Sequence, residues 1–331
     1  MLKRVTNSLR GRYVYYGFLL KQLMASPIFT SDMRFTMRKY QKTFNSVPDL
    51  EAPKTFNEKI NWRKLYDRRK IFIELCDKLA VRKYVAEKAG GQYLNKLLFV
   101  TDDPHSIPFD DLPDKFVLKA NHGSSMIILV EDRSGIDRQF IINRCGNFLR
   151  TNFYDYCREW CYKKVTPQIL IEEYLSDDDS YPMDYKFYCF DGKVKAIHVD
   201  IDRFSEHKRI FYTPDWQQMP LKFNYPNTLD AVPAPQKLSN MISVAELLSD
   251  GFDFLRVDLF NIRGKVFFGE LTLYPEAGFG RFFPLQYDRI FGDWWTLPRK
   301  KTNGWGLSYR LSQAVEYLYI SRRARSRFQE S

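Results

Sequence analysis

The amino-acid sequence predicts an α+β protein of two lobes, each a β-sheet with helices, with basic helical extensions at both ends. At 331 residues the chain is longer than one typical domain. Its hydrophobic spacing is helical up to about residue 91 and changes to short strands with polar turns from residue 97 onward. An acidic turn at 176–181 separates the strands into two sets, and two mixed lobes are the natural architecture for this order.

The two ends of the chain carry much of its net charge of +11. No acid occurs before Asp32, and residues 1–31 predict one or two amphipathic helices. The tail, 299–331, is rich in arginine and predicts another basic helix. Such helices suit an anionic membrane surface, although a helix packed on the core with its basic side in water explains the pattern equally well.

The region 53–91 predicts two helices. The first carries Phe56 and Ile60 at helical spacing, and the second is expected to run without interruption from Ile71 to Lys88. The pair Gly90-Gly91 then ends the helical pattern.

Four short strands are expected in the first lobe, with one helix among them. The predicted strands are LLFV from Leu97, KFVLKA at 115–120, MIILVE at 126–131 and QILIEEYL at 168–175, and the helix covers about 137–150.

A second set of strands follows the acidic turn. It comprises DYKFYCF, KAIHVDI after the turn Asp191-Gly192, RIFY at 209–212, a helix at about 236–250, and a hairpin over 254–275.

The hairpin has acids placed in otherwise apolar strands. Because alternate residues of a strand share a face, Arg256 and Asp258 point to one side of the first strand. A three-residue turn centred on Gly264 places Asp258 directly opposite Glu270, whereas a two-residue turn places it opposite Gly269.

Two neighbouring carboxylates repel unless a cation lies between them, and paired oxygen ligands suit Mg²⁺. Arg256, one pleat away from Asp258, would then face any phosphate that the metal holds. The alternative is an edge hairpin with solvated acids, which the strongly apolar surroundings disfavour.

Two further segments have binding character. Lys119 lies on the less apolar side of its strand and is followed by the small polar loop Asn121-His122-Gly123-Ser124-Ser125. A lysine followed by such a loop fits a phosphate cradle, and many ordinary strand connections look similar. The strand 168–175 is expected either to present backbone groups to an adenine edge or to be a plain lobe boundary.

Composition excludes some classes of protein. The hydrophobic fraction of 44% and the aromatic fraction of 16% indicate a folded globular chain. The five cysteines form no CxxC pair and no zinc-site spacing, which favours reduced thiols in a cytoplasmic protein. The longest apolar run near the N-terminus, 13–20, is too short to span a bilayer. No nucleic-acid-binding module is recognisable, so we expect no nucleic-acid partner.

The order of these segments resembles the ATP-grasp superfamily, and more narrowly its TupA-like branch, over roughly residues 44–298. The resemblance rests on seven blocks: FNEKINWRKLYDR (56–68), DKLAVRKYV (77–85), DKFVLKANHGS (114–124), ILIEEYL (169–175), DYKFYCFDGK (184–193), VDIDRFSEHKRIFY (199–212) and RVDLF…FGELTLYP in the hairpin.

The resemblance implies an ATP-grasp fold, in which two α+β lobes clasp a nucleotide. Its expected divisions are a basic N-terminal extension at 1–43, a helical region at 44–110, a small lobe at 111–175, a large lobe with the metal site at 176–298 and a basic C-terminal helix at 299–331. ATP and Mg²⁺ are the implied cofactors.

Residue roles follow from the same resemblance. Asp258 and Glu270 look like the Mg²⁺ ligands, and Arg256 looks like the contact to the transferred phosphate. The implied nucleotide contacts are Arg82, Lys119, His122, Gly123 and Ser124 for phosphates, Glu172, Glu173, Tyr174 and Leu175 for the adenine hinge, and Asp184 on the ribose side.

The chain departs from the wider superfamily in two places. Thr272 stands where the last strand usually has Asn, which leaves open whether one or two metal ions bind. The loop 121–125 has a single glycine, which leaves its closing motion open.

On the acceptor side, a basic cluster follows a strand of the second set. Arg203, His207, Lys208 and Arg209 could hold an anionic substrate, and a solvated basic loop explains them as well.

The resemblance implies a ligase that joins a carboxylate to an amine through an acyl phosphate. The carboxylate would be a uronic acid or similar group of a capsule or other cell-surface polysaccharide, and the enzyme would be cytoplasmic, held at the inner membrane face by its basic ends. The alternative is a metal-dependent glycosyltransferase of the same pathway that uses the DxD triplet Asp200-Ile201-Asp202.

Overall fold

The computed structural model describes residues 31–176, 182–201, 207–228 and 232–298. The chain divides into two compact units, one of residues 54–298 and one of residues 1–53 and 299–331. In the latter, helix α2 (Ser31–Phe44) has Met33, Met37 and Tyr40 on one buried face. The predicted basic helices at 1–31 and 299–331 lie outside the described residues.

Three helices open the larger unit: α3 (Phe56–Tyr66), α4 (Ile71–Cys76) and α5 (Val81–Lys88). Helix α3 begins with a capping box, in which Thr55 and Glu58 each bond the other's backbone N–H. The single helix predicted over 71–88 is wrong. Asp77 takes an extended conformation after α4, and its carboxylate accepts the backbone N–H of Leu79 at 2.8 Å in the turn that precedes α5.

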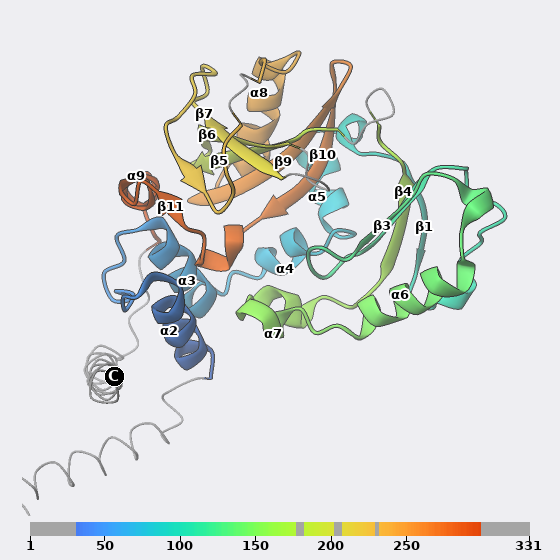
Figure 1. The fold of residues 1–331 in the computed structure, drawn as a ribbon, viewed down its shortest axis with the longest axis horizontal. Helices are drawn as coiled ribbons and strands as arrows, with labels where there is room; N and C mark the ends of the chain where they lie inside the picture. The colour runs from blue at the N-terminus through green and yellow to red at the C-terminus, as the bar shows by residue number, and fades with distance from the viewer. Residues whose placement is uncertain (1–30, 177–181, 202–206, 229–231, 299–331) are drawn as a thin grey trace, which may run out of the picture. The chain divides into compact units, whose positions relative to one another are not determined.

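The first sheet has four antiparallel strands in the order β1-β4-β2-β3. They are β1 (Leu97–Thr101), β2 (Phe116–Ala120), β3 (Ile127–Val130) and β4 (Ile169–Glu173), as the alternating patterns predicted. Helix α6 (Arg138–Arg150) lies along this sheet, and its side chains form a hydrophobic core with Phe116 and Leu118 (Figure 1). Lys119 and Glu172 therefore belong to the opposite face.

The second sheet has five antiparallel strands in the order β10-β9-β5-β6-β7. They are β5 (Asp184–Phe190), β6 (Lys193–Ile201), β7 (Lys208–Tyr212), β9 (Phe254–Ile262) and β10 (Lys265–Thr272). Smaller elements are the strand pair β8 (Lys222–Phe223) and β11 (Phe282–Phe283), the helices α7 (Tyr154–Cys157) and α9 (Gln286–Asp293), and the 3-10 helices η2 (Gly91–Tyr93), η3 (Pro104–Ser106), η4 (Arg133–Gly135), η5 (Trp160–Lys164) and η6 (Pro275–Gly278).

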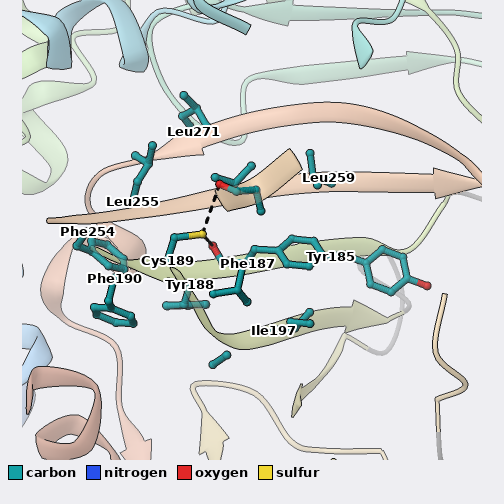
Figure 2. Close-up of a cluster of buried hydrophobic side chains, with 14 of the residues drawn as sticks. Tyr185, Phe187, Tyr188, Cys189, Phe190, Ile197, Phe254, Leu255, Leu259 and Leu271 are labelled. Atoms are coloured by element: carbon teal, nitrogen blue, oxygen red, sulfur yellow. Dashed lines mark hydrogen bonds between the residues drawn. The ribbon is translucent and has the colours of Figure 1, made fainter. Parts of the chain in front are cut away.

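The two faces of the five-stranded sheet differ in chemistry. Helix α8 (Leu238–Ser249) packs on the face that carries Phe187, Cys189 and Leu255. These three side chains are fully buried and belong to the hydrophobic cluster in Figure 2. Cys189 Sγ bonds the Ala245 carbonyl of this helix at 3.7 Å. The residues that alternate with these, among them the acids of β5 and β9, point to the other face.

The β9–β10 hairpin reaches the predicted pairing by a different route. Its turn has two residues, Arg263 and Gly264, both with positive φ, and not the predicted three. A β-bulge between Phe268 and Glu270 then shifts the register by one residue, so that Glu270 does lie directly opposite Asp258.

Within the described ranges no helix combines the length and apolar character that crossing a bilayer requires. Strand β1 pairs with β4 although it precedes residue 111, where the sequence places the start of the small lobe.

Candidate active site

The hairpin brings two carboxylates together around one guanidinium. Arg256 donates to Asp258 through Nε and Nη2, both at 2.7 Å, and Nη2 also reaches Glu270 Oε1 at 3.1 Å. Thr272 completes the group, since its hydroxyl lies 2.9 Å from Arg256 Nη2 and donates to Glu270 Oε1 at 3.0 Å. Arg256 and Asp258 are buried, whereas Glu270 is one-third exposed.

Lys186, on the central strand β5, extends this group. Strand β5 pairs with β9 so that Lys186 lies opposite Asp258, and the Nζ atom is 2.9 Å from Asp258 Oδ2. The same ammonium bonds Asp184 two residues away on its own strand and lies 3.9 Å from Asp200 Oδ2 on β6. Lys186 is only 5% exposed, so its ammonium is buried among these carboxylates.

A second group of charges lies on β6 and β7. Asp200 Oδ1 accepts from His198 Nε2 at 2.7 Å and from Arg209 Nε at 2.8 Å, and His207 Nε2 is 2.8 Å away. Arg209 also donates to Glu276 Oε1 at 2.9 Å. Asp200 Oδ1 thus has three nitrogen partners, and the side chain is 2% exposed.

Glu276 stands on a turn with unusual backbone geometry. Glu276, Ala277 and Gly278 all have positive φ, of 48°, 54° and 74°. Residues other than glycine keep such a backbone conformation only where contacts with the surrounding structure hold it in place. Buried side chains of α3 supply that support: Asn57 Nδ2 bonds Gly280 O at 2.8 Å, Asn61 Nδ2 bonds Gly278 O at 2.7 Å, and Lys64 Nζ bonds Ala277 O at 2.8 Å.

Lys78, between α4 and α5, links the hairpin to the loop after β2. Its Nζ lies 3.8 Å from Glu270 Oε2 and donates to the Gly123 carbonyl. A Cβ on Gly123 would lie 2.5 Å from the Met126 methyl and 2.6 Å from the Phe153 ring, so this position requires glycine.

The rest of the predicted phosphate loop is divided between the interior and the surface. Ser124 is exposed. His122 is 3% exposed, and its Nε2 lies 3.1 Å from the Thr151 carbonyl, so the ring points into the protein. Burial lowers the pKa of His122.

The four-stranded sheet carries a separate charge cluster. Glu172 is 3% exposed and accepts from Lys119 Nζ at 2.5 Å, from Arg82 Nη1 at 3.0 Å and from Asn95 Nδ2 at 2.9 Å. The predicted phosphate contacts Lys119 and Arg82 therefore lie together, held by a residue predicted for the adenine hinge.

The other hinge residues are distributed along the end of β4. Glu173 is still part of the sheet, and its carboxylate accepts the Lys96 N–H at 2.7 Å. Tyr174 and Leu175 follow the strand, and the Tyr174 hydroxyl donates to Glu131 at 2.9 Å. Both residues lie beyond Glu173, the last residue of β4.

The local environment shifts the pKa values of the acids in opposite directions. Burial raises the pKa of Asp258, although Arg256 and Lys186 oppose the change. Burial also favours the neutral form of Glu172, but Lys119, Asn95 and Arg82 outweigh it, and the pKa of Glu172 lies below its usual value. Burial and the neighbouring Arg209 lower the pKa of His198, so its imidazole is neutral and donates to Asp200.

The sequence missed several members of these clusters. Lys186 could have been found, because alternation along DYKFYCF puts it on the same face as Asp184. His198 could have been found in the same way, because it alternates with Asp200 along KAIHVDI. No local pattern marks Lys78 or Asn95, whose partners lie on distant segments. Of the predicted acceptor cluster, His207 and Arg209 meet at Asp200, Lys208 lies at the start of β7, and Arg203 is outside the described residues.

The donor set of the hairpin fits Mg²⁺. Asp258 and Glu270 face each other with the Thr272 hydroxyl beside them, and all three offer oxygen. Among the residues that the structure describes, no group of three or more His, Cys, Asp or Glu side chains could hold a metal. Two carboxylates are nevertheless enough for Mg²⁺ when substrate phosphates supply further ligands.

Comparison with known proteins gives one family. A family model described as TupA-like ATPgrasp matches residues 58–296. No curated protein matches the chain.

Several solved structures are similar over part of their length. D-alanine–D-alanine ligase from Bacillus anthracis, complexed with ATP, is 14% identical with a TM-score of 0.37 over 60% of this chain and 54% of that one. The ADP complex of purK, N5-carboxyaminoimidazole ribonucleotide synthetase, is 12% identical with a TM-score of 0.40 over 71% and 55%. D-cycloserine synthetase DcsG is 14% identical with a TM-score of 0.37 over 68% and 70%. The chain thus spans little more than half the length of the first two.

Proposed function

The chain belongs to the TupA-like ATP-grasp family, and from this premise we propose that it is an ATP-dependent carboxylate–amine ligase. The observation that carries the proposal is the pairing of Asp258 with Glu270 around Arg256 on one face of the hairpin. Two oxygen ligands beside a guanidinium are what a metal-bound polyphosphate requires. Bound Mg²⁺ would neutralise charge on the phosphates.

The proposed reaction has two displacements. A carboxylate oxygen attacks the γ-phosphorus of ATP, the bond to the β,γ-bridging oxygen breaks, and ADP leaves with the electron pair. The amine nitrogen then attacks the acyl carbon, inorganic phosphate leaves, and the nitrogen loses a proton to the solvent. Arg256 would face the transferred phosphoryl group, where a positive charge stabilises the transition state.

The nucleotide would lie against the cation cluster of the four-stranded sheet. Lys119 and Arg82 share the single carboxylate of Glu172, so one positive charge remains for phosphate oxygens. Tyr174 and Leu175 supply backbone groups for the adenine, and Asp184 would meet the ribose. In this proposal residues 111–175 and 176–298 act as the two lobes that hold the nucleotide.

The acceptor would bind near Arg209. This guanidinium is held between Asp200 and Glu276, beside His207, and Arg209 directly follows Lys208 at the start of β7. With Arg203, these residues are proposed to recognise an anionic carboxylate substrate. A uronic acid of a cell-surface polysaccharide is the finer proposal that the family suggests.

The glycosyltransferase alternative has no geometric support. It needs Asp200 as an open metal ligand, but this carboxylate is buried and has three nitrogen partners. Asp202 lies outside the described residues.

The test is ADP release from ATP in the presence of Mg²⁺ with a panel of uronic acids and amino acids. Wild type, Glu270→Gln and the control Glu246→Gln are compared, because Glu246 is on α8, against the other face of the sheet, where it pairs with Lys193. Release that needs both substrates and is lost only in Glu270→Gln supports the ligase. Absence of ATP binding by calorimetry, with and without Mg²⁺, contradicts it.

We further propose a cytoplasmic enzyme held on the inner membrane face by its basic ends. Sedimentation with anionic liposomes at low salt tests this, with neutral liposomes as the control. An enzyme that stays in the supernatant with both would exclude the membrane role.

A further inference from the structure

Lys186 occupies a position that the proposed roles of its neighbours do not explain. It lies on β5, the central strand, between the hairpin carboxylates on β9 and β10 and the Arg209 cluster on β6 and β7. Its Nζ bonds Asp184 and Asp258 and lies 3.9 Å from Asp200. A single ammonium therefore joins the two halves of the polar face.

A buried lysine is costly unless its charge is compensated. One carboxylate would compensate it, and Asp184 on the same strand already does so. The further bond to Asp258 places the ammonium at the residue proposed to bind the metal. Lys186 thus has more carboxylates around it than are needed to compensate its buried charge.

Asp258 has its oxygens engaged by two cations. Oδ1 accepts from Arg256 Nε, and Oδ2 accepts from both Arg256 Nη2 and Lys186 Nζ, at 2.7 and 2.9 Å. A divalent cation that binds Asp258 must therefore compete with nitrogen donors. The Lys186 side chain has a flexible four-carbon stem, so its ammonium can give up the bond to Asp258 and keep the bond to Asp184.

Resting on the proposed ligase function, we propose that Lys186 is, after Arg256, a second counter-ion for the carboxylates of Asp258 and Glu270. In the metal-free protein it neutralises Asp258, and with a divalent cation held by Asp258 its ammonium would instead hold the anion formed between the substrates. That anion is the acyl phosphate. Its phosphoryl end would lie beside Asp258 and Glu270, and its acyl end would lie beside Arg209 and its partners. Lys186 acts by charge and neither gives nor takes a proton. Its place between the two clusters is the place where these ends meet.

Titration of the nucleotide-free protein with Mn²⁺, followed by calorimetry, separates this role from a structural one. We compare wild type, Lys186→Met, Lys186→Arg and the control Lys193→Met, since Lys193 is an exposed lysine at the start of the neighbouring strand β6. Removing a competing positive charge about 4 Å from the cation should tighten Mn²⁺ binding by roughly tenfold or more in Lys186→Met. Lys186→Arg and Lys193→Met should bind Mn²⁺ as wild type does.

Turnover supplies the second readout. ADP release by Lys186→Met should fall about 100-fold through kcat although its metal binds more tightly, and Lys186→Arg should recover part of the loss. Weaker Mn²⁺ binding in Lys186→Met, equal binding in all four proteins, or no binding in any of them overturns the inference. If wild type releases no ADP with any substrate pair, the proposed ligase function fails, and the metal titration still reports the competition at Asp258 on its own.

Discussion

The cluster around Glu172 on the four-stranded sheet and the cluster around Arg256 and Lys186 on the five-stranded sheet use the same residue types in opposite proportions. On the four-stranded sheet, two cations, Lys119 and Arg82, share the one carboxylate of Glu172. On the five-stranded sheet, the two cations Arg256 and Lys186 bond three carboxylates. Counted by hydrogen-bonded partners, the first cluster therefore has an excess of cations and is called the positive cluster, and the second has an excess of acids and is called the negative cluster. A further cation, Lys78, lies 3.8 Å from Glu270 of the second cluster.

This difference assigns the two clusters complementary ligands. A positive cluster attracts phosphate oxygens, and a negative one attracts a metal cation. The pKa directions follow the same proportions, since that of Glu172 is lowered by its cations and that of Asp258 is raised by burial in spite of them. A complex of metal and polyphosphate needs both environments.

The largest effect is expected from removing a charge of the negative cluster. Asp258→Asn should reduce ADP release at least about 100-fold and abolish Mn²⁺ binding by calorimetry, because a neutral amide is a weaker ligand. Asp250→Asn is the control, since Asp250 is an exposed acid that pairs only loosely with Lys88 at 3.8 Å. Normal metal binding by Asp258→Asn would remove the distinction between the clusters.

A smaller effect is expected from the positive cluster. Lys119→Met should weaken ATP binding by roughly tenfold, because one charge-assisted contact to phosphate is lost while Arg82 and Asn95 still hold Glu172. Calorimetry with ATP measures this, and Lys115→Met, an exposed lysine just before β2, is the control. Unchanged ATP affinity in Lys119→Met would show that phosphates bind elsewhere.

The β9–β10 register, which places Asp258 opposite Glu270, can be disturbed by a substitution that changes no charged residue. A Cβ on Gly269 would lie 3.0 Å from the Asp258 carbonyl oxygen and 3.2 Å from the Phe260 ring. Gly269→Ala should therefore lower the free energy of unfolding by about 1–2 kcal/mol and weaken Mn²⁺ binding. Urea unfolding measures the first effect, and Gly91→Ala, where nothing lies within 4 Å, should change it by less than about 0.5 kcal/mol. Equal stability of the two variants would mean that the bulge accepts a side chain.

The smallest effect is a change in acid sensitivity. Because the pKa of Glu172 is lower in the folded protein, its ionisation adds stability above its ordinary pKa of 4.5, and this contribution is lost as the pH falls through the folded-state value. Glu172→Gln should thus lose less stability than wild type below about pH 4.5 in urea unfolding. Glu87→Gln, at an exposed helical position, is the control and should follow wild type. A variant as acid-sensitive as wild type would contradict the lowered pKa.

Alternating and helical hydrophobic patterns were enough to predict nearly all strands and long helices of the larger unit. Their spacing is a local property, so one sequence suffices. The Asp258–Glu270 pairing was also predicted, but through a three-residue turn, whereas the structure combines a two-residue turn with a bulge. Bulge position depends on packing across the hairpin, which local spacing does not encode.

Contacts between distant segments were the least predictable. The cluster around Glu172 combines α5, the segment before β1, and two strands, so its ion pairs depend on the relative placement of four segments. The break at Asp77 was missed because one extended residue inside a helical pattern leaves the hydrophobic period intact. Lys186 was overlooked although its strand pattern was read correctly.

The bonds from α3 to the turn at 275–280 also determine how the protein opens. Asn61 and Gly278 are 217 residues apart in the chain, yet the amide of one holds the carbonyl of the other. Fraying of α3 would release the left-handed turn and with it the position of Glu276. In native-state hydrogen exchange, α3 and the turn should therefore exchange as one cooperative unit. A truncated chain that begins after Tyr66 would lack the side chains of α3 that hold the turn at 275–280 in place.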